Sequence, residues 1–310
     1  FLLNNISKMK QDTEIGSRIA EVHNGSSLFT GDAGSGESNA RRYMFENDLV
    51  EAIVAVPENM FYNTGIATYI WILSNKKEER RKGKVQLIDA TAMKSPLKKN
   101  MGQKNSEFTL EIRKEIVRIF CEMEESDVSK IFSNEDFAYW SVTVERPLRL
   151  RVHPENEIPD SAFRRNDNRE EVRQAVKKAA TSAPLDDWTA FSKSTGLKAA
   201  MLKRIRPFIT ETDPAAKAVD GEADTELRDT ELIPLTYAGG IEAFIEKEVY
   251  PYAPDAYIDE KKTQIGYEVS FAKYFYKPIE LRPMAEIIED LQRLEKESDG
   301  VLEGILEGLV

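Results

Sequence analysis

The chain has 310 residues, of which 41% are hydrophobic and 31% charged, the composition of a soluble globular protein large enough to bury a sizeable core. No apolar run approaches the roughly 20 residues that a membrane span needs, so we expect no membrane association. A single cysteine, Cys121, cannot form an internal disulfide, which predicts a cytoplasmic location. The net charge of −11 is concentrated in residues 221–310, which hold 9 Lys and Arg against 21 Asp and Glu.

The first fifty residues show the alternation of strand and helix patterns that is typical of an α/β protein. Residues 18–23 are a predicted short strand, and a loop at residues 31–38 leads into a predicted helix at residues 39–47. Gly34 and Gly36 in that loop imitate the glycine turn of a dinucleotide or S-adenosylmethionine site. A lone Gly-x-Gly is weak evidence, and the favoured interpretation is a flexible connection that caps the next helix.

Two apolar segments, residues 50–56 and 68–73, are the most informative part of the chain. Both are rich in β-branched and aromatic residues, which predicts strands buried on both faces of a sheet covered by helices. The loop between them places two adjacent aromatics, Phe61 and Tyr62, just beyond the carboxyl end of the first strand. Ligands bind at that edge of open α/β sheets, so these two residues are candidates for ligand contact.

Residues 47–53 (NDLVEAI) and 57–66 (PENMFYNTGI) resemble the C-terminal half of the adenine-specific DNA methylase domain in the modification subunit of type I restriction-modification systems. Residues 130–150, 231–244 and 265–271 contain further similar phrases. The resemblance implies an α/β fold: a partial S-adenosylmethionine-dependent methyltransferase sheet of Rossmann-like type, followed by a mixed α+β region and a C-terminal helix.

The resemblance also implies a function. Members of the family methylate adenine N6 in DNA with S-adenosylmethionine, in a complex with a specificity subunit and a restriction subunit. The Asn-Pro-Pro-aromatic motif of the family does not occur in this sequence, and residues 95–97 (SPL) are the nearest approach. We therefore expect the chain to hold the second half of the fold, with no catalytic residue, and to be inactive and unable to bind S-adenosylmethionine alone. The alternative is a non-catalytic module that docks the specificity subunit.

In related adenine methylases an aromatic side chain in the loop before the last hairpin strand packs on the flipped base. By position this role falls to Phe61, with Tyr62 as second choice, and the alternative is that Phe61 plugs the end of the sheet. Residues 76–104 carry ten basic and three acidic residues, which indicates a phosphate-facing patch or else a solvated loop. The candidate DNA-backbone contacts are Lys94, Lys98, Lys99 and Lys104. With one cysteine and two histidines, no metal site is expected.

The remaining pattern is less regular. A basic connector is predicted at residues 91–105, an amphipathic helix at 106–124, and a strand at 141–152 whose Pro147 suggests an edge position. Residues 153–230 are polar and close in an acidic linker at residues 213–231. The predicted division is residues 1–95 for the methyltransferase half-domain, 96–230 for a helical connector with the edge strand and polar linker, and 231–310 for a small α+β region ending in an interaction helix.

That last helix is predicted from residue 282 to residue 310. Its apolar residues follow a three-four spacing between acidic flanks, which is a seam too apolar to stay in water alone. We expect it to pack either on its own chain or, as the resemblance implies, on the specificity subunit.

Overall fold

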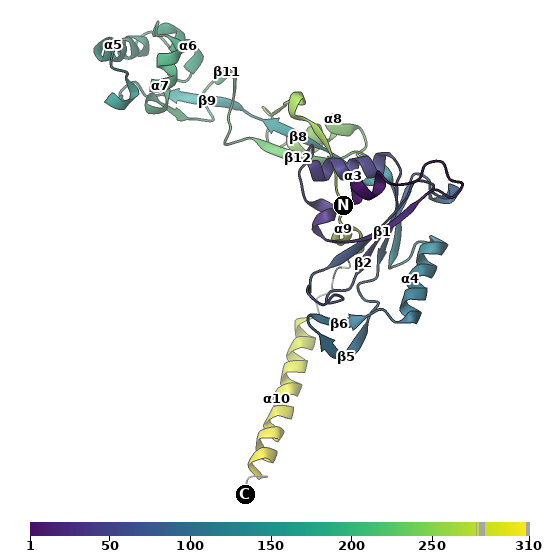
Figure 1. Ribbon diagram of the computed structural model, residues 1–310. Coiled ribbons are helices and arrows are strands. Elements are labelled where there is room, and N and C mark those ends of the chain that lie inside the picture. The colour runs from purple at the N-terminus through teal and green to yellow at the C-terminus, as the bar shows by residue number, and fades with distance from the viewer. Residues whose placement is uncertain (277, 279–282, 308–310) are drawn as a thin grey trace. The chain divides into compact units, whose positions relative to one another are not determined.

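The computed structural model describes residues 1–276, 278 and 283–307, with only the backbone described at residues 295 and 297–307. Residues 1–270 form one compact unit and residues 271–310 a second (Figure 1). The α/β class expected from the sequence is confirmed, because helices and a mixed sheet alternate through the first unit.

The N-terminal part of the first unit is a five-stranded sheet in the order β1-β3-β2-β4-β7. Its strands are β1 (Arg18–Asn24), β2 (Val50–Val56), β3 (Thr68–Ser74), β4 (Lys84–Asp89) and β7 (Ser129–Ser133). Neighbouring strands are antiparallel except β2 and β4, which run parallel. The two apolar segments of the sequence are therefore adjacent central strands, as predicted.

Both faces of this sheet are covered, which explains the continuous apolar runs. Ile53 pairs with Trp71, whose ring lies 6.4 Å from that of Phe45 on helix α3 (Gly36–Glu46). The next residue, Val54, packs in a separate core with Ile119 of helix α4 (Leu110–Glu122). Because successive strand residues point to opposite faces, α3 and α4 cover opposite sides of the sheet.

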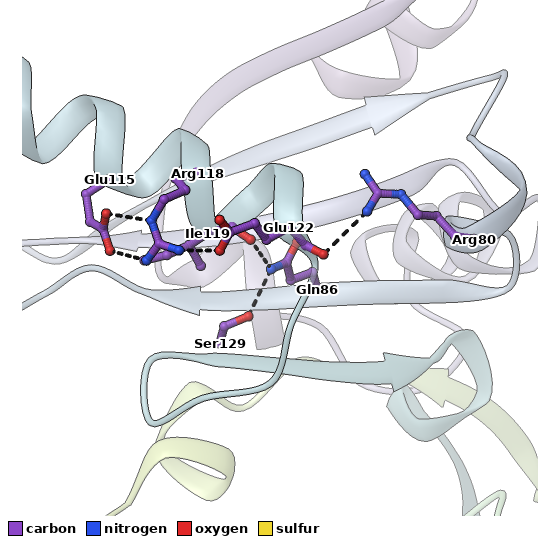
Figure 2. Close-up of polar contacts among 7 residues, drawn as sticks. All are labelled: Arg80, Gln86, Glu115, Arg118, Ile119, Glu122 and Ser129. Atoms are coloured by element: carbon purple, nitrogen blue, oxygen red, sulfur yellow. Dashed lines mark hydrogen bonds and ion pairs between the residues drawn. The ribbon is translucent and has the colours of Figure 1, made fainter.

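Side chains from the sheet hold the C-terminal end of α4, whose last carbonyls lack partners within the helix. Gln86 of β4 is fully buried and donates to the carbonyl oxygen of Ile119 at 3.0 Å and to the hydroxyl of Ser129 at 2.9 Å (Figure 2). Arg80 donates to the carbonyl oxygens of Cys121 and Glu122. These cationic and amide donors both satisfy the helix end and complement its dipole.

Helix α3 begins at Gly36, three residues before the predicted start, and Ser35 rather than Gly36 or Ser38 caps it by accepting from the backbone of Ser38. Two short helices precede it, α1 (Leu2–Ile6) and α2 (Ser26–Phe29). Arg41 of α3 is buried and donates to the carbonyl oxygens of Thr30 and Tyr267, so α3 is tied to a strand far along the chain.

The strand predicted at an edge over residues 141–152 is wrong in its placement. Two strands occur there, β8 (Ala138–Glu145) and β9 (Pro147–Val152), and each is central in its own sheet. Pro147 is the first residue of β9, where a missing N–H costs least. The partners of β8 are β12 (Asp229–Pro234), β13 (Tyr257–Ile258) and β14 (Gln264–Tyr267), and the chain between them forms α8 (Gly240–Phe244) and a π-helical turn (Ile245–Val249).

Residues 147–224 form a module with a core of its own, which includes most of the residues 153–230 that the sequence predicted as a polar region ending in a linker. Strand β9 lies between β10 (Thr210–Thr212) and β11 (Ala218–Ala223), and helices α5 (Arg169–Ala180), α6 (Trp188–Ser194) and α7 (Ala199–Ile209) pack around the same core. The prediction of an acidic linker at residues 213–231 is wrong, because this range contains β11 and the first residues of β12. Acidic residues alternate there on exposed strand positions and so conceal the strands.

The second unit contains α9 (Phe271–Phe275) and α10 (Met284–Glu307). Residues 282 and 308–310 of the predicted terminal helix lie outside the described residues. None of the described helices is long and apolar enough to cross a membrane.

Candidate functional site

The carboxyl ends of the parallel strands β2 and β4 meet at one edge of the sheet. Ala55 of β2 pairs with Asp89 of β4, and the amide of Ala90 donates to the carbonyl oxygen of Ala55 at 3.0 Å. The aromatic loop, residues 57–67, leaves this edge after β2, and the lysine-rich segment leaves it after β4. The parallel pairing thus brings together two sequence features that lie thirty or more residues apart.

The lysine-rich segment is a β-hairpin, and its prediction as a connector is wrong. Strands β5 (Ser95–Met101) and β6 (Lys104–Glu107) pair antiparallel and turn at Gly102, whose φ is +63°. A Cβ at Gly102 would collide with the backbone carbonyl of Tyr62. Only glycine therefore fits the turn, for its backbone angle and for its close approach to the aromatic loop.

Backbone hydrogen bonds hold the aromatic loop on the hairpin. The amide of Gln103 donates to the carbonyl oxygen of Tyr62 at 2.9 Å, and that of Asn105 to the carbonyl oxygen of Asn59 at 3.1 Å. Asn59 itself has a φ of +58°, a conformation that asparagine tolerates better than most residues. Because these contacts use main-chain atoms, they fix the loop while leaving its aromatic side chains available.

The two aromatics differ in their surroundings. Phe61 is 36% exposed and makes an isolated β-bridge with Thr64 across the tip of the loop. Tyr62 is 60% exposed, and the ammonium of Lys104 lies 5.8 Å from its ring centre, within cation–π range. The structure thus places Tyr62 and Lys104 together.

The other candidate lysines lie along the same hairpin or just before it. Lys94, Lys98 and Lys99 are exposed, and residues 94–107 hold four lysines against one glutamate, Glu107. Such a cluster attracts phosphate without discriminating between bases. Aromatic rings beside unneutralised lysines form a surface suited to a nucleic acid strand.

Polar groups line the sheet edge beneath the loop. Asp89 accepts from the amide and the hydroxyl of Thr91, at 3.0 and 2.6 Å, and so fixes the start of the segment that leads to the hairpin. Burial, helped by the charge of Asp89, raises the pKa of Tyr69. Thr68, the first residue of β3, is 5% exposed, and its buried hydroxyl has no hydrogen-bond partner among the described residues.

The weak cofactor candidates lie elsewhere. Gly34 has a φ of +83°, and a Cβ there would collide with the side chain of Gln264 from β14. Gly36 is the first residue of α3. Both glycines are exposed, Gly34 with the Gln264 side chain against it and Gly36 with open space around its Cβ position, and the interpretation of this loop as a connection rather than a cofactor site stays a prediction. The described residues contain no group of three or more metal-binding side chains.

Sequence reasoning missed the residues that position the loop, Asn59, Gly102 and Gln103. Their role depends on main-chain contacts between the loop and the hairpin. Such contacts cannot be predicted from the types of the residues. Gly102 was the one available signal, as a glycine between two short polar segments typical of a hairpin turn.

Residues 1–146 match the model of a protein family described as N-6 DNA methylase. Among curated proteins, the methylase subunit of the type I restriction enzyme MjaIX from Methanocaldococcus jannaschii is 36% identical over 98 residues, 31% of this chain and 17% of that protein. The methylase subunit of the HindI enzyme from Haemophilus influenzae is 44% identical over 54 residues, 17% of this chain and 12% of that protein. The matched part of the chain thus spans less than a fifth of these relatives.

Two solved structures are similar over part of the chain. The methyltransferase subunit of a type I restriction-modification system from Streptococcus thermophilus has a TM-score of 0.37 at 24% identity, covering 44% of this chain and 26% of that one. A modification subunit of a putative type I restriction enzyme from Vibrio vulnificus has a TM-score of 0.33 at 16% identity, with coverages of 43% and 26%. At these scores neither structure adds to the sequence match.

Proposed function

We propose that this chain forms the DNA-facing and base-facing part of a type I restriction-modification methylase, which the match of residues 1–146 to the N-6 DNA methylase model supports. The reaction is transfer of a methyl group from S-adenosylmethionine to the N6 amine of adenine. DNA and the specificity and restriction subunits are the proposed partners, in the cytoplasm. The observation that carries the proposal is the docking of the aromatic loop on the lysine hairpin at the carboxyl edge of the sheet.

Methyl transfer to adenine requires a surface with exposed aromatic rings and lysines, as on the aromatic loop and the hairpin. The N6 amine cannot be reached inside a duplex, so the adenine must leave the stack, and the enzyme must replace the lost stacking. Phe61, one-third exposed at the tip of the loop, is the proposed stacking residue, and Tyr62 beside Lys104 is the second. The hairpin lysines hold the phosphates that flank the extruded base. The cofactor supplies the methyl group when bound, and no residue of this chain is assigned to hold it.

No catalytic residue is assigned to this chain either. In this family the acceptors for the adenine amine come from the Asn-Pro-Pro-aromatic motif, which these 310 residues do not contain. On its own the chain is therefore proposed to bind DNA without methylating it.

Replacing Phe61 by alanine in the methylase tests the proposal. Loss of one base–aromatic stack costs about 1 to 3 kcal/mol, a decrease of about 5- to 150-fold in kcat/KM for methyl transfer to DNA. Phe61→Tyr retains a ring and is the matched control, with near-normal kinetics expected. The measurement is methyl transfer to duplex DNA together with the fluorescence of 2-aminopurine at the target position, which reports base extrusion. Unchanged kinetics in Phe61→Ala would remove this residue from the site.

A further inference from the structure

The helix pair α6–α7 in the module of residues 147–224 carries an unusual charge pattern. Residues 188–210 contain five Lys and Arg and no Asp or Glu, in a chain whose net charge is −11. Over the three helices together, residues 161–210 hold eleven basic residues against five acidic ones. This segment is therefore locally positive although the whole chain repels polyanions.

The pair has the construction of a helix-turn-helix. A short helix, α6, is joined to the longer α7 by a turn at residues 195–198, in which Gly196 has a φ of +68° and open space around its Cβ position. A four-residue turn containing glycine is typical of this motif. The pair packs beside α5 at the end of β9 (Figure 1).

Apolar residues fasten both helices to the core and leave one face outside. Phe191 of α6 is fully buried, as are Ile205 and Ile209 of α7. Asp187 caps α6 by accepting from the amide of Ala190, and the ammonium of Lys217 lies 2.8 Å from the same carboxylate. The pair is thus held rigidly, so its outer face is a defined surface.

The outer face presents cations that the protein does not neutralise. Lys193 of α6, Lys198 in the turn and Lys203 of α7 are all exposed, and none has an ion-pair partner in the part of the chain that the structure describes. The arginines of α7 differ, because Arg204 pairs with Asp167 and Arg206 with Glu222. Among the described residues, helix α7 therefore carries both ion-paired arginines and an unpaired lysine.

We propose that the α6–α7 pair is a second binding surface for duplex DNA, with α7 in the major groove and the three free lysines on flanking phosphates. Exposed Ala199 and Ala200 at the first turn of α7 let its backbone approach the groove closely. The major groove of B-DNA admits an α-helix, whereas that of A-form RNA is too narrow, which favours DNA. Flexible lysines act as point charges and read no sequence, so the contact is sequence-independent.

The test compares duplex DNA binding by the 310-residue chain and by the triple variant Lys193→Gln, Lys198→Gln and Lys203→Gln. The probe is a short fluorescent duplex of mixed sequence, titrated over a range of salt concentrations. The variant is expected to bind about tenfold more weakly near 0.1 M salt, and the slope of log K against log salt should fall by about 0.9 for each lost phosphate contact, or about 2 to 3 in all. Glutamine keeps the helix propensity and no ion pair is lost, so far-UV circular dichroism should not change.

A matched control removes three exposed lysines elsewhere, with Lys8→Gln, Lys10→Gln and Lys261→Gln. Its binding should match the parent chain. Equal weakening in both variants would overturn the proposal, because net charge alone would then explain the loss. Unchanged binding in the α6–α7 variant would also overturn the proposal, and an acidic protein would then be the partner for that surface. With a duplex RNA probe of the same length, weakening seen only for RNA would overturn the assignment to DNA in favour of RNA.

The proposal is independent of the function assigned to the lysine hairpin. The pair Lys98→Gln and Lys99→Gln is expected to lower affinity by a separate, additive amount. If either the triple variant of α6–α7 or the double variant of the hairpin leaves binding unchanged, the surface carrying those substitutions does not contact DNA.

Discussion

Lys77 is a buried lysine whose charge is balanced by Asp48. Its side chain is only 2% exposed, and its ammonium donates to Asp48 at 2.6 Å and to the carbonyl oxygen of Lys84 at 2.9 Å. Burial lowers the pKa of Lys77, and the hydrogen bond that its ammonium donates to Asp48 acts in the opposite direction. For Asp48, burial raises the pKa but is outweighed by hydrogen bonds from Lys77, Gly83 and Asn134, so the pKa lies below its usual value.

A substitution at Asp48 should therefore show a defined pH dependence. A depressed carboxyl pKa contributes stability above the unfolded value, about 3.9, and that stability is lost as the pH falls through the folded pKa. Asp48→Asn leaves Lys77 buried without its counter-charge, at an expected cost of about 3 kcal/mol at pH 7. The difference from the parent chain should begin to shrink as the pH falls below about 4, the unfolded pKa, and should disappear only below the lower folded pKa, where Asp48 is protonated in the folded chain too.

Urea denaturation at pH 7 and at pH 3 measures this effect. Asp12→Asn, at an exposed position, is the control and should change stability little at either pH. A cost for Asp48→Asn that is equal at the two pH values would show that the carboxylate charge does not stabilise the fold.

At the scale of elements, the hairpin β5–β6 matters through its contact with the aromatic loop. Two glycines have similar backbone angles, with φ of +63° at Gly102 and +68° at Gly83. Comparing substitutions at these two positions distinguishes the effect of the loop contact from the effect of backbone strain. A Cβ at Gly102 meets the carbonyl of Tyr62, whereas a Cβ at Gly83 meets nothing within 4 Å.

Gly102→Ala should release the loop from the hairpin, and Gly83→Ala should not. Both substitutions carry a strain of about 1 kcal/mol, since alanine is disfavoured at positive φ. Hydrogen exchange at the amides of Gln103 and Asn105 is expected to accelerate only in Gly102→Ala, because those amides donate to the loop. Protection that is unaltered in Gly102→Ala would mean that the docked geometry does not depend on the glycine.

At the scale of the whole molecule, the chain divides into residues 1–270 and 271–310. The described apolar residues of α10 are largely exposed, with Leu291 at 60% and Leu294 at 55%. We propose that this apolar helix face binds protein rather than DNA, since the last third of the chain is acidic. This supports the proposal that the helix docks the specificity subunit.

Leu291→Asp with Leu294→Asp is expected to abolish co-purification with the specificity subunit while leaving the melting temperature of this chain nearly unchanged. The matched control, Ala285→Asp with Gln292→Asp, adds the same charge on a different face of α10 and should co-purify normally. If the leucine variant instead unfolds the isolated chain, the helix belongs to the core of its own chain and the docking proposal fails.

The sequence by itself determined the central strands β2 and β3, helix α4 and the type of fold, because apolar periodicity follows directly from burial on one or both faces. Short phrases around Phe61 also carried the resemblance to the type I modification subunits, and residues 1–146 match the N-6 DNA methylase model. The division of the chain at residues 95 and 230 and the roles of the candidate site residues stay predictions.

Only the tertiary structure decided the features that depend on backbone pairing between residues far apart in the sequence. Strand β8 looked like an edge strand because Pro147 interrupts the pattern, yet it is central because partners come from residues 229–267. The hairpin and the strands of the 147–224 module are polar on their exposed faces, so local sequence resembles a loop where backbone pairing makes a strand. The site itself is decided in the same way, since the loop and the hairpin meet only when β2 and β4 pair in parallel.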